Sequence, residues 1–169
     1  MNKAVVLVGT SHAYQRGGES CSPSELIAFQ DFIYSLCQKW QIELVTEEMS
    51  QGALEERGLT ESTVKQVVSS NSIRHKYIDP DREQRKGLGI TENSDIKVQG
   101  VFQEWSDAEI ERRIGVEYKK RESLWLWSLL LIDQWPSLFV CGSEHVDSFS
   151  KLLQNSQIVV HIGASDWAP

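Results

Sequence analysis

The sequence is poor in cysteine. Its three cysteines, Cys21, Cys37 and Cys141, are widely spaced and form no Cys-x-x-Cys pair. An odd number of cysteines in this arrangement predicts neither a disulfide framework nor a zinc knuckle. Cys37 lies in an apolar pattern of helical spacing and Cys141 ends an apolar strand pattern, so we expect both in the core.

Long hydrophobic runs are also missing. The apolar run at residues 5–8 is too short for a signal peptide, and no small-residue cleavage site follows it. The longest apolar stretch, residues 124–132, adjoins a charged segment and is too short to span a membrane. We therefore expect a cytoplasmic protein with no membrane contact.

Basic residues are outnumbered, 17 against 24 acidic ones, and the net charge is -7. A general nucleic-acid binder needs a basic face to neutralise phosphates, so that class is disfavoured, although a nucleotide pocket with a few local arginines is not. With 169 residues, of which 40% are hydrophobic and 24% charged, the chain is typical of one globular domain over residues 1–169.

Strand and helix patterns alternate along the chain. Short apolar runs predict strands at residues 5–8, 42–45, 77–80, 138–141 and 158–162. Capping signals or helical spacing predict helices at residues 22–40, 63–68, 106–135 with a break or kink near Gly115, and 144–154. This order predicts an α/β fold: a single-domain, three-layer, mostly parallel sheet of about five strands with helices on both faces.

Polar and glycine-containing sequence separates the third strand from the long helix. We predict a loop or lid insertion at residues 82–105, because long loops in compact domains are often functional.

Two Gly-x-x-His turns each follow an apolar strand. They are Gly9-Thr10-Ser11-His12 and Gly142-Ser143-Glu144-His145. Glycine lets the backbone bend sharply as it leaves a sheet, and the carboxyl ends of parallel strands meet at one edge. We therefore expect His12 and His145 in one site, together with residues that follow the other strands: Glu47, Glu48, Asp79, Asp81, Glu144, Asp166 and Trp167.

Two histidines with one or two carboxylates can bind a divalent metal such as zinc, manganese, nickel or iron. The candidate ligands are His12, His145 and Glu48, and the candidate catalytic residues are His12, Glu47, Glu48 and His145. A metal would polarise a carbonyl or phosphoryl oxygen or lower the pKa of a bound water, with Glu47, Glu48 or Glu144 as general base. The alternative is that each histidine is a hydrogen-bonding turn residue.

Three further residues are candidates for substrate binding. Arg82 and Arg85 follow the third strand and could hold a phosphate or carboxylate, and Glu144 lies beside the second turn. For the arginines, surface ion pairs with Asp81 and Glu83 are the simpler interpretation. Neither turn has the Gly-x-Ser-x-Gly pattern of a serine hydrolase.

The remaining histidines and the tryptophans favour structural roles. His75 precedes the predicted third strand, away from the site edge, and we expect it to be structural or exposed; His161 falls inside the fifth strand. The Trp-rich stretch around Trp125, Trp127 and Trp135 predicts a helix that packs on the sheet. Exposed tryptophans would instead indicate a homodimer or partner surface.

The order of these elements resembles the TraB/Tiki group and its relatives, the erythromycin-esterase and ChaN-like proteins. The matching elements are Gly9-Thr10-Ser11-His12, Glu47 or Glu48, Asp79-Pro80-Asp81-Arg82, and Gly142-Ser143-Glu144-His145. The resemblance to Tiki members implies a metal-dependent protease that uses both histidines and the glutamate. The resemblance to the esterases implies water activation by histidine and glutamates, and ChaN-like members bind haem iron.

Two functional hypotheses follow. The first is a hydrolase, metal-dependent or histidine/glutamate-dependent, that acts on a small-molecule or peptide-like substrate. The second is a non-catalytic ligand-binding or interaction protein that uses the same pocket, with the Trp-rich helix for dimer or partner contact. A relic of the fold without an active site is a third.

Overall fold

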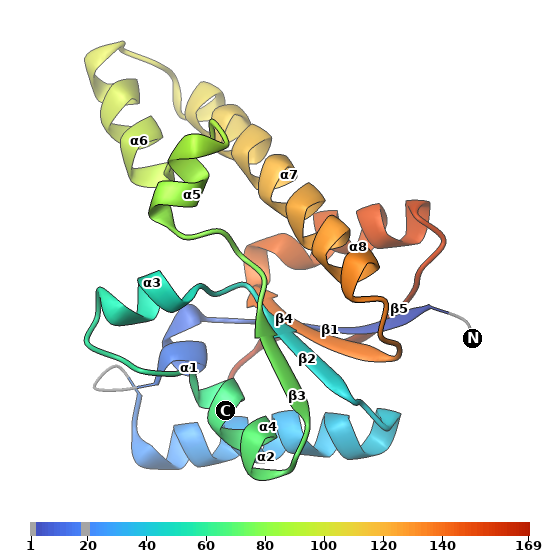
Figure 1. Cartoon of the computed structure of the whole chain (residues 1–169). Helices are drawn as coiled ribbons and strands as arrows, with labels where there is room; N and C mark the ends of the chain where they lie inside the picture. The colour runs from blue at the N-terminus through green and yellow to red at the C-terminus, as the bar shows by residue number, and fades with distance from the viewer. Residues whose placement is uncertain (1–2, 18–20) are drawn as a thin grey trace.

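A computed structural model describes residues 3–17 and 21–169 (Figure 1). Five strands form one all-parallel sheet in the order β3-β2-β4-β1-β5. The strands are β1 (Ala4–Thr10), β2 (Leu44–Glu47), β3 (Arg74–Tyr77), β4 (Ser137–Gly142) and β5 (Val159–Trp167). The predicted α/β class with a parallel sheet is confirmed.

Helices cover both faces of the sheet. The helices are α1 (His12–Arg16), α2 (Pro23–Trp40), α3 (Gln51–Glu55), α4 (Thr63–Ser70), α5 (Arg82–Gly87), α6 (Asn93–Phe102), α7 (Asp107–Ile132) and α8 (Val146–Asn155), with a 3-10 turn, η1 (Ser143–His145), before α8. Side chains of β1 alternate between two cores, Val6 and Val8 facing α2 and α4, Val5 and Leu7 facing α7 and α8. The result is the three-layer arrangement visible in Figure 1.

Local sequence signals explain where the two longest helices begin. Ser22 and Glu25 form a reciprocal capping box at the start of α2, and Ser106 accepts a hydrogen bond from the Glu109 amide at the start of α7. The break predicted near Gly115 is wrong, because α7 runs through it without interruption. One glycine costs a helix about 1 kcal/mol relative to alanine, which the packing of a 26-residue helix outweighs.

The loop predicted at residues 82–105 is also wrong. The segment folds into α5 and α6, and these lie with the first half of α7 beyond the strand ends (Figure 1). Asp81 and Gln84 form a capping box that starts α5, and Gly100 of α6 lies so close to Ile110 of α7 that a Cβ would overlap it. The polar composition of this segment hid α5 and α6 from an apolar pattern, because their contacts are mostly polar or are made with α7.

All five strands have boundaries that differ from those predicted, and the differences in β2, β3 and β5 bear most on the site. β2 extends two residues further, to Glu47, and β3 ends at Tyr77, where the prediction began. β5 continues to Trp167, so Asp166 and Trp167 lie inside a strand instead of following it. The sequence of β3, Arg-His-Lys-Tyr, is polar because it forms an edge of the sheet, and this hid the strand from an apolar pattern.

The chain changes face between the neighbouring strands β1 and β4. β1 leads to α2 on one face and β4 leads to α8 on the other, and Thr10 pairs with Gly142 where the two strands end. In open parallel sheets a crevice forms at such a switch point, outside the carboxyl ends of the strands. Both Gly-x-x-His turns begin here. A Cβ at Gly9 would overlap the Ser165 carbonyl oxygen and the Val146 side chain, so this position accepts only glycine.

The cysteines lie as their patterns predicted. Cys37 and Cys141 are buried, and burial raises the pKa of the Cys37 thiol to about 11. No helix in the described part of the chain has the length and apolar character to cross a membrane.

Candidate functional site

Glu48 is the centre of the candidate site. It directly follows β2 and is buried, with Oε2 accepting a hydrogen bond of 2.7 Å from the Gly142 amide. Its other oxygen, Oε1, accepts from the Arg121 guanidinium. The Nε2 atoms of His12 and His145 lie 3.6 Å and 3.5 Å from that same Oε1. The two Gly-x-x-His turns thus bring both imidazoles to one carboxylate oxygen.

The His145 ring is fixed by the residues around it. Its Nδ1 lies 2.8 Å from Oε1 of Glu122, and a carboxylate oxygen accepts hydrogen bonds, so Nδ1 carries the proton. The ring is fully buried, with centroid distances of 4.2 Å to Tyr118 and 4.8 Å to Trp125. His145 Nε2 has no hydrogen-bond partner. In the neutral ring this buried nitrogen presents a lone pair towards Glu48.

The His12 ring has the same tautomer for a different reason. The Gln15 amide nitrogen donates to Glu47 Oε2 at 3.4 Å and to the Val140 carbonyl at 3.3 Å. A flipped amide would place its oxygen against these two oxygens, so the orientation is determined. Gln15 Oε1 therefore accepts from His12 Nδ1, at 2.7 Å. The neutral His12 ring also presents its Nε2 lone pair to Glu48.

Asp79 and Arg121 connect α5 and α7 to Glu48 through hydrogen bonds. Asp79 follows β3 and accepts hydrogen bonds from Arg121, from Arg85 and from the Trp125 indole, the last at 2.8 Å. Burial opposes the charge of Arg121, but Glu48 and Asp79 together raise its pKa above the ordinary value. Arg121 is therefore a permanent cation beside Glu48.

A cavity of about 300 Å³ opens on the exposed side of His12. Its charged lining residues are His12, Arg16, Glu48, Asp79, Arg85, Glu92, Glu117, Arg121 and Glu144. Arg16 forms no ion pair with another residue in the ranges 3–17 and 21–169. Burial, and then repulsion from Arg57, lower its pKa below the ordinary value. This side of the cavity suits an anionic group.

Glu47, a predicted catalytic residue, points to the other side of the sheet. Successive residues of a strand face opposite ways, so Glu47 and Glu48 cannot share a site. Glu47 is fully buried and accepts hydrogen bonds from the Ser62 hydroxyl and from His75 Nε2, the latter at 2.7 Å. His75 lies inside β3 with its side chain only 5% exposed, so the expectation that it precedes the strand is wrong.

The predicted substrate-binding residues lie in different places. Arg82 is exposed and lines a neighbouring cavity instead of this one. Arg85 lines the cavity, but its guanidinium already binds Asp79 and Glu92. These partners replace the expected pairs with Asp81 and Glu83. Glu144 is exposed and lines the cavity, as its place beside the turn suggested.

Two other predicted edge residues lie away from the cavity. Asp81 begins α5 as its capping residue. Trp167 packs on Phe29 and Phe32 of α2, with ring centroids 4.9 Å and 5.6 Å away. His161 stacks on Trp40, which is the structural role expected of it.

The sequence interpretation missed the contribution of α7. Arg121 and Glu122, which hold Glu48 and His145, come from the helix that was assigned only a packing role. A signal was present: Glu122, Trp125 and Leu129 recur at spacings of three and four residues and are all buried, which places a charged residue on the apolar face of the helix. A charge in such a position needs a partner.

The donor set formed by His12 Nε2, His145 Nε2 and Glu48 Oε1 has the chemistry of a divalent-metal site, and Glu122 bonded to His145 Nδ1 is a usual supporting contact. Arg121 on the same Glu48 oxygen is a competing cation. Within residues 3–17 and 21–169, no group of three or more His, Cys, Asp or Glu side chains is arranged to hold a metal ion.

Compared with protein-family models, curated proteins and solved structures, the chain matches none of them. The resemblance to the TraB/Tiki group and its relatives therefore stays a prediction, and the function is argued from the geometry of this chain alone.

Proposed function

We propose that the site around Glu48 is hydrolytic and acts on a small-molecule or peptide-like substrate that carries an anionic group. One observation carries this proposal: among residues 3–17 and 21–169, each imidazole forms its hydrogen bond through Nδ1, and both Nε2 atoms lie near the same Glu48 oxygen. Imidazoles held in one tautomer at the edge of a cavity suit proton removal from water.

The roles follow from exposure and charge. His12 lines the cavity and is the base that contacts the attacking water, while His145 and Glu48 are buried behind it. A proton taken up by His12 is stabilised by the Glu48 carboxylate. Arg121 binds the Glu48 carboxylate, and Arg16, which lines the same cavity, orients the anionic group of the substrate. Arg16 thus takes the role that the sequence had suggested for Arg82 or Arg85.

A metal-assisted form of the same reaction is the second candidate. The unpartnered, buried Nε2 of His145 favours it, because an orphaned polar atom in a core calls for a partner. His12, His145 and Glu48 would hold zinc, manganese, nickel or iron, which would supply Lewis acidity to the water or to the scissile carbonyl.

The test compares wild-type protein with His12→Ala, His145→Ala and the double variant. The probes are p-nitrophenyl acetate, p-nitrophenyl phosphate and succinyl-alanine p-nitroanilide, assayed after EDTA treatment and after addition of Zn²⁺, Mn²⁺, Ni²⁺ or Fe²⁺. We expect the double variant to lose about 10²- to 10⁴-fold in kcat/KM. His161→Ala, a histidine far from the cavity, is the matched control and should retain the wild-type rate.

Elemental analysis of the same samples separates the two forms. About one metal ion per chain in the wild type, lost in the double variant, supports the metal-assisted form. Wild-type rates equal to those of the double variant on every probe, with and without metals, would overturn the hydrolytic proposal and favour the ligand-binding hypothesis.

A further inference from the structure

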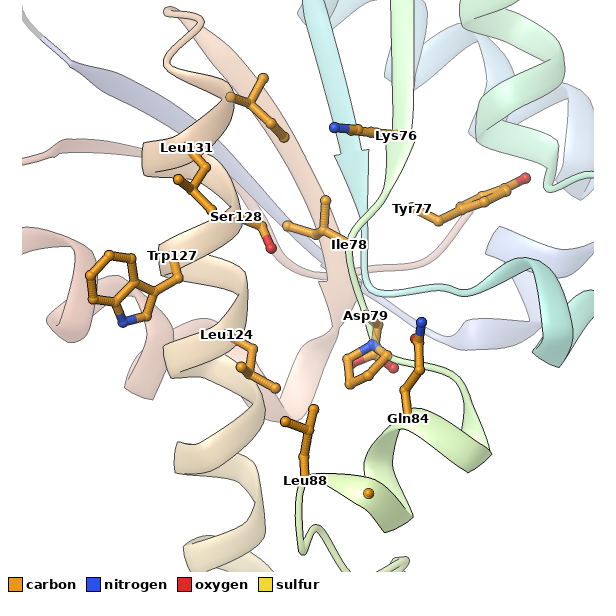
Figure 2. Close-up of a pocket in the computed structure, with 13 residues that line it drawn as sticks. Lys76, Tyr77, Ile78, Asp79, Gln84, Leu88, Leu124, Trp127, Ser128 and Leu131 are labelled. Carbon is orange, nitrogen blue, oxygen red and sulfur yellow. The ribbon is translucent and has the colours of Figure 1, made fainter.

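A second cavity lies outside the candidate site. It is an open groove of about 950 Å³ between the last turns of α7 and the connection from β3 to α5 (Figure 2). Its apolar lining is Ile78, Pro80, Leu88, Leu124, Trp127, Leu131 and Ile132.

The apolar side chains that line the groove are unusually exposed. The exposed fractions are 55% for Leu88, 64% for Trp127 and 79% for Leu131. In Figure 2, Leu88, Leu124 and Ile78 point into the space between α7 and β3. Single exposed apolar residues are ordinary, but a contiguous set around one cavity marks a binding surface.

The groove contains one cation that lacks a partner. Lys76 of β3 lines it, and the Lys76 ammonium forms no ion pair with any residue in 3–17 or 21–169. The only carboxylate in the lining, Asp79, is buried and already binds Arg85, Arg121 and Trp125. The groove therefore combines a long apolar wall with a single available positive charge.

We propose that this groove binds an amphipathic monoanion, an aliphatic chain ending in a carboxylate, with the chain along Leu124, Leu131 and Leu88 and the carboxylate at Lys76. One ammonium matches one carboxylate, whereas a phosphate or a nucleotide would leave further charge unmatched. The apolar wall supplies the binding free energy and Lys76 supplies the orientation and the choice of charge. The proposal is independent of the hydrolytic function of the Glu48 site.

The test is isothermal titration of the full chain with dodecanoate below its critical micelle concentration. Leu131→Asp places a like charge in the groove and should weaken binding at least about tenfold, equivalent to 1.4 kcal/mol. Phe102→Asp is the matched control: Phe102 on α6 is 81% exposed, close to the 79% of Leu131, and lies outside the groove, so binding should be unchanged.

Lys76→Gln tests the charge separately. It should weaken dodecanoate binding about threefold, as expected for a partly exposed ion pair, and leave dodecyltrimethylammonium binding no weaker. Equal loss of dodecanoate binding in Leu131→Asp and Phe102→Asp would overturn the proposal, because it would indicate nonspecific adsorption. It would also be overturned by wild-type dimerisation that Leu131→Asp abolishes, since the groove would then be covered by a second copy.

Discussion

Two neighbouring glutamates at the end of β2, Glu47 and Glu48, lie in hydrogen-bond networks on opposite faces of the sheet. Glu47 faces α1 and α4, where His75 Nε2 and the Ser62 hydroxyl bind it directly. Glu48 faces α7, and its Oε1 lies 3.6 Å from His12 Nε2 and 3.5 Å from His145 Nε2, which is too far for a good hydrogen bond. His145 Nε2 has no hydrogen-bond partner. The same residue types thus form a satisfied network on one face and an incompletely satisfied one beside a cavity on the other. A core network that only stabilises the fold tends to be complete, so the incomplete one is the candidate for function.

The largest expected effect is on activity and comes from a substitution of Glu48. Glu48→Gln keeps the size of the side chain but removes the charge that stabilises a protonated His12. If the hydrolytic proposal is right, kcat/KM should fall by about 10³-fold, which lies within the range for acid–base catalysis. The same assay on Glu47→Gln should show a loss below about tenfold, because Glu47 reaches the site only through Gln15. Similar losses in the two variants would remove the distinction between the two faces.

The second prediction concerns stability, for which we expect Glu47 to matter more than Glu48. Glu47→Ala leaves Ser62, His75 and Gln15 without a shared buried acceptor, so the free energy of unfolding should fall by about 3–5 kcal/mol. Glu48→Ala should cost less, because Arg121 keeps its bonds to Asp79. Urea denaturation followed by Trp fluorescence measures both. A larger loss in Glu48→Ala would show that the Glu48 network is the main structural one.

The third prediction concerns the support of His145. Glu122→Gln retains an acceptor for Nδ1 but loses the negative charge, so hydrolysis should fall about 10- to 100-fold, as for other groups that orient an active histidine. Ser148→Ala removes a second bond to the same Glu122 oxygen but leaves its charge, so hydrolysis should stay close to the wild-type rate. A loss as large as that of Glu122→Gln would show that packing around this oxygen, and not its charge, determines the rate.

The meeting of the two Gly-x-x-His turns at one sheet edge could be predicted from the sequence, but the choice between the glutamates could not. The two Gly-x-x-His turns follow apolar strands, and the sheet edge brings them together as parallel topology requires. The predicted β2 ended at residue 45, two residues before the observed end. The alternation of side chains along a strand could therefore not be extended to Glu47 and Glu48 to decide which of them faces the site. Arg121 and Glu122 come from a helix remote in sequence, and only the tertiary packing of α7 reveals which face of it meets Glu48.

The smallest expected effect tests the single link between the two faces. Gln15→Met keeps the volume but removes the acceptor of the His12 Nδ1 proton. His12 should then populate the Nε2-protonated form that predominates for free imidazole side chains, which nitrogen-15 chemical shifts of the ring detect directly. Activity should fall only about fivefold, the equivalent of the ~1 kcal/mol that one hydrogen bond contributes. The His161 ring, which stacks on Trp40 away from the site, is the internal control and should keep its shifts. An unchanged His12 tautomer would show that Gln15 does not determine it, and the Glu47 network would then be purely structural.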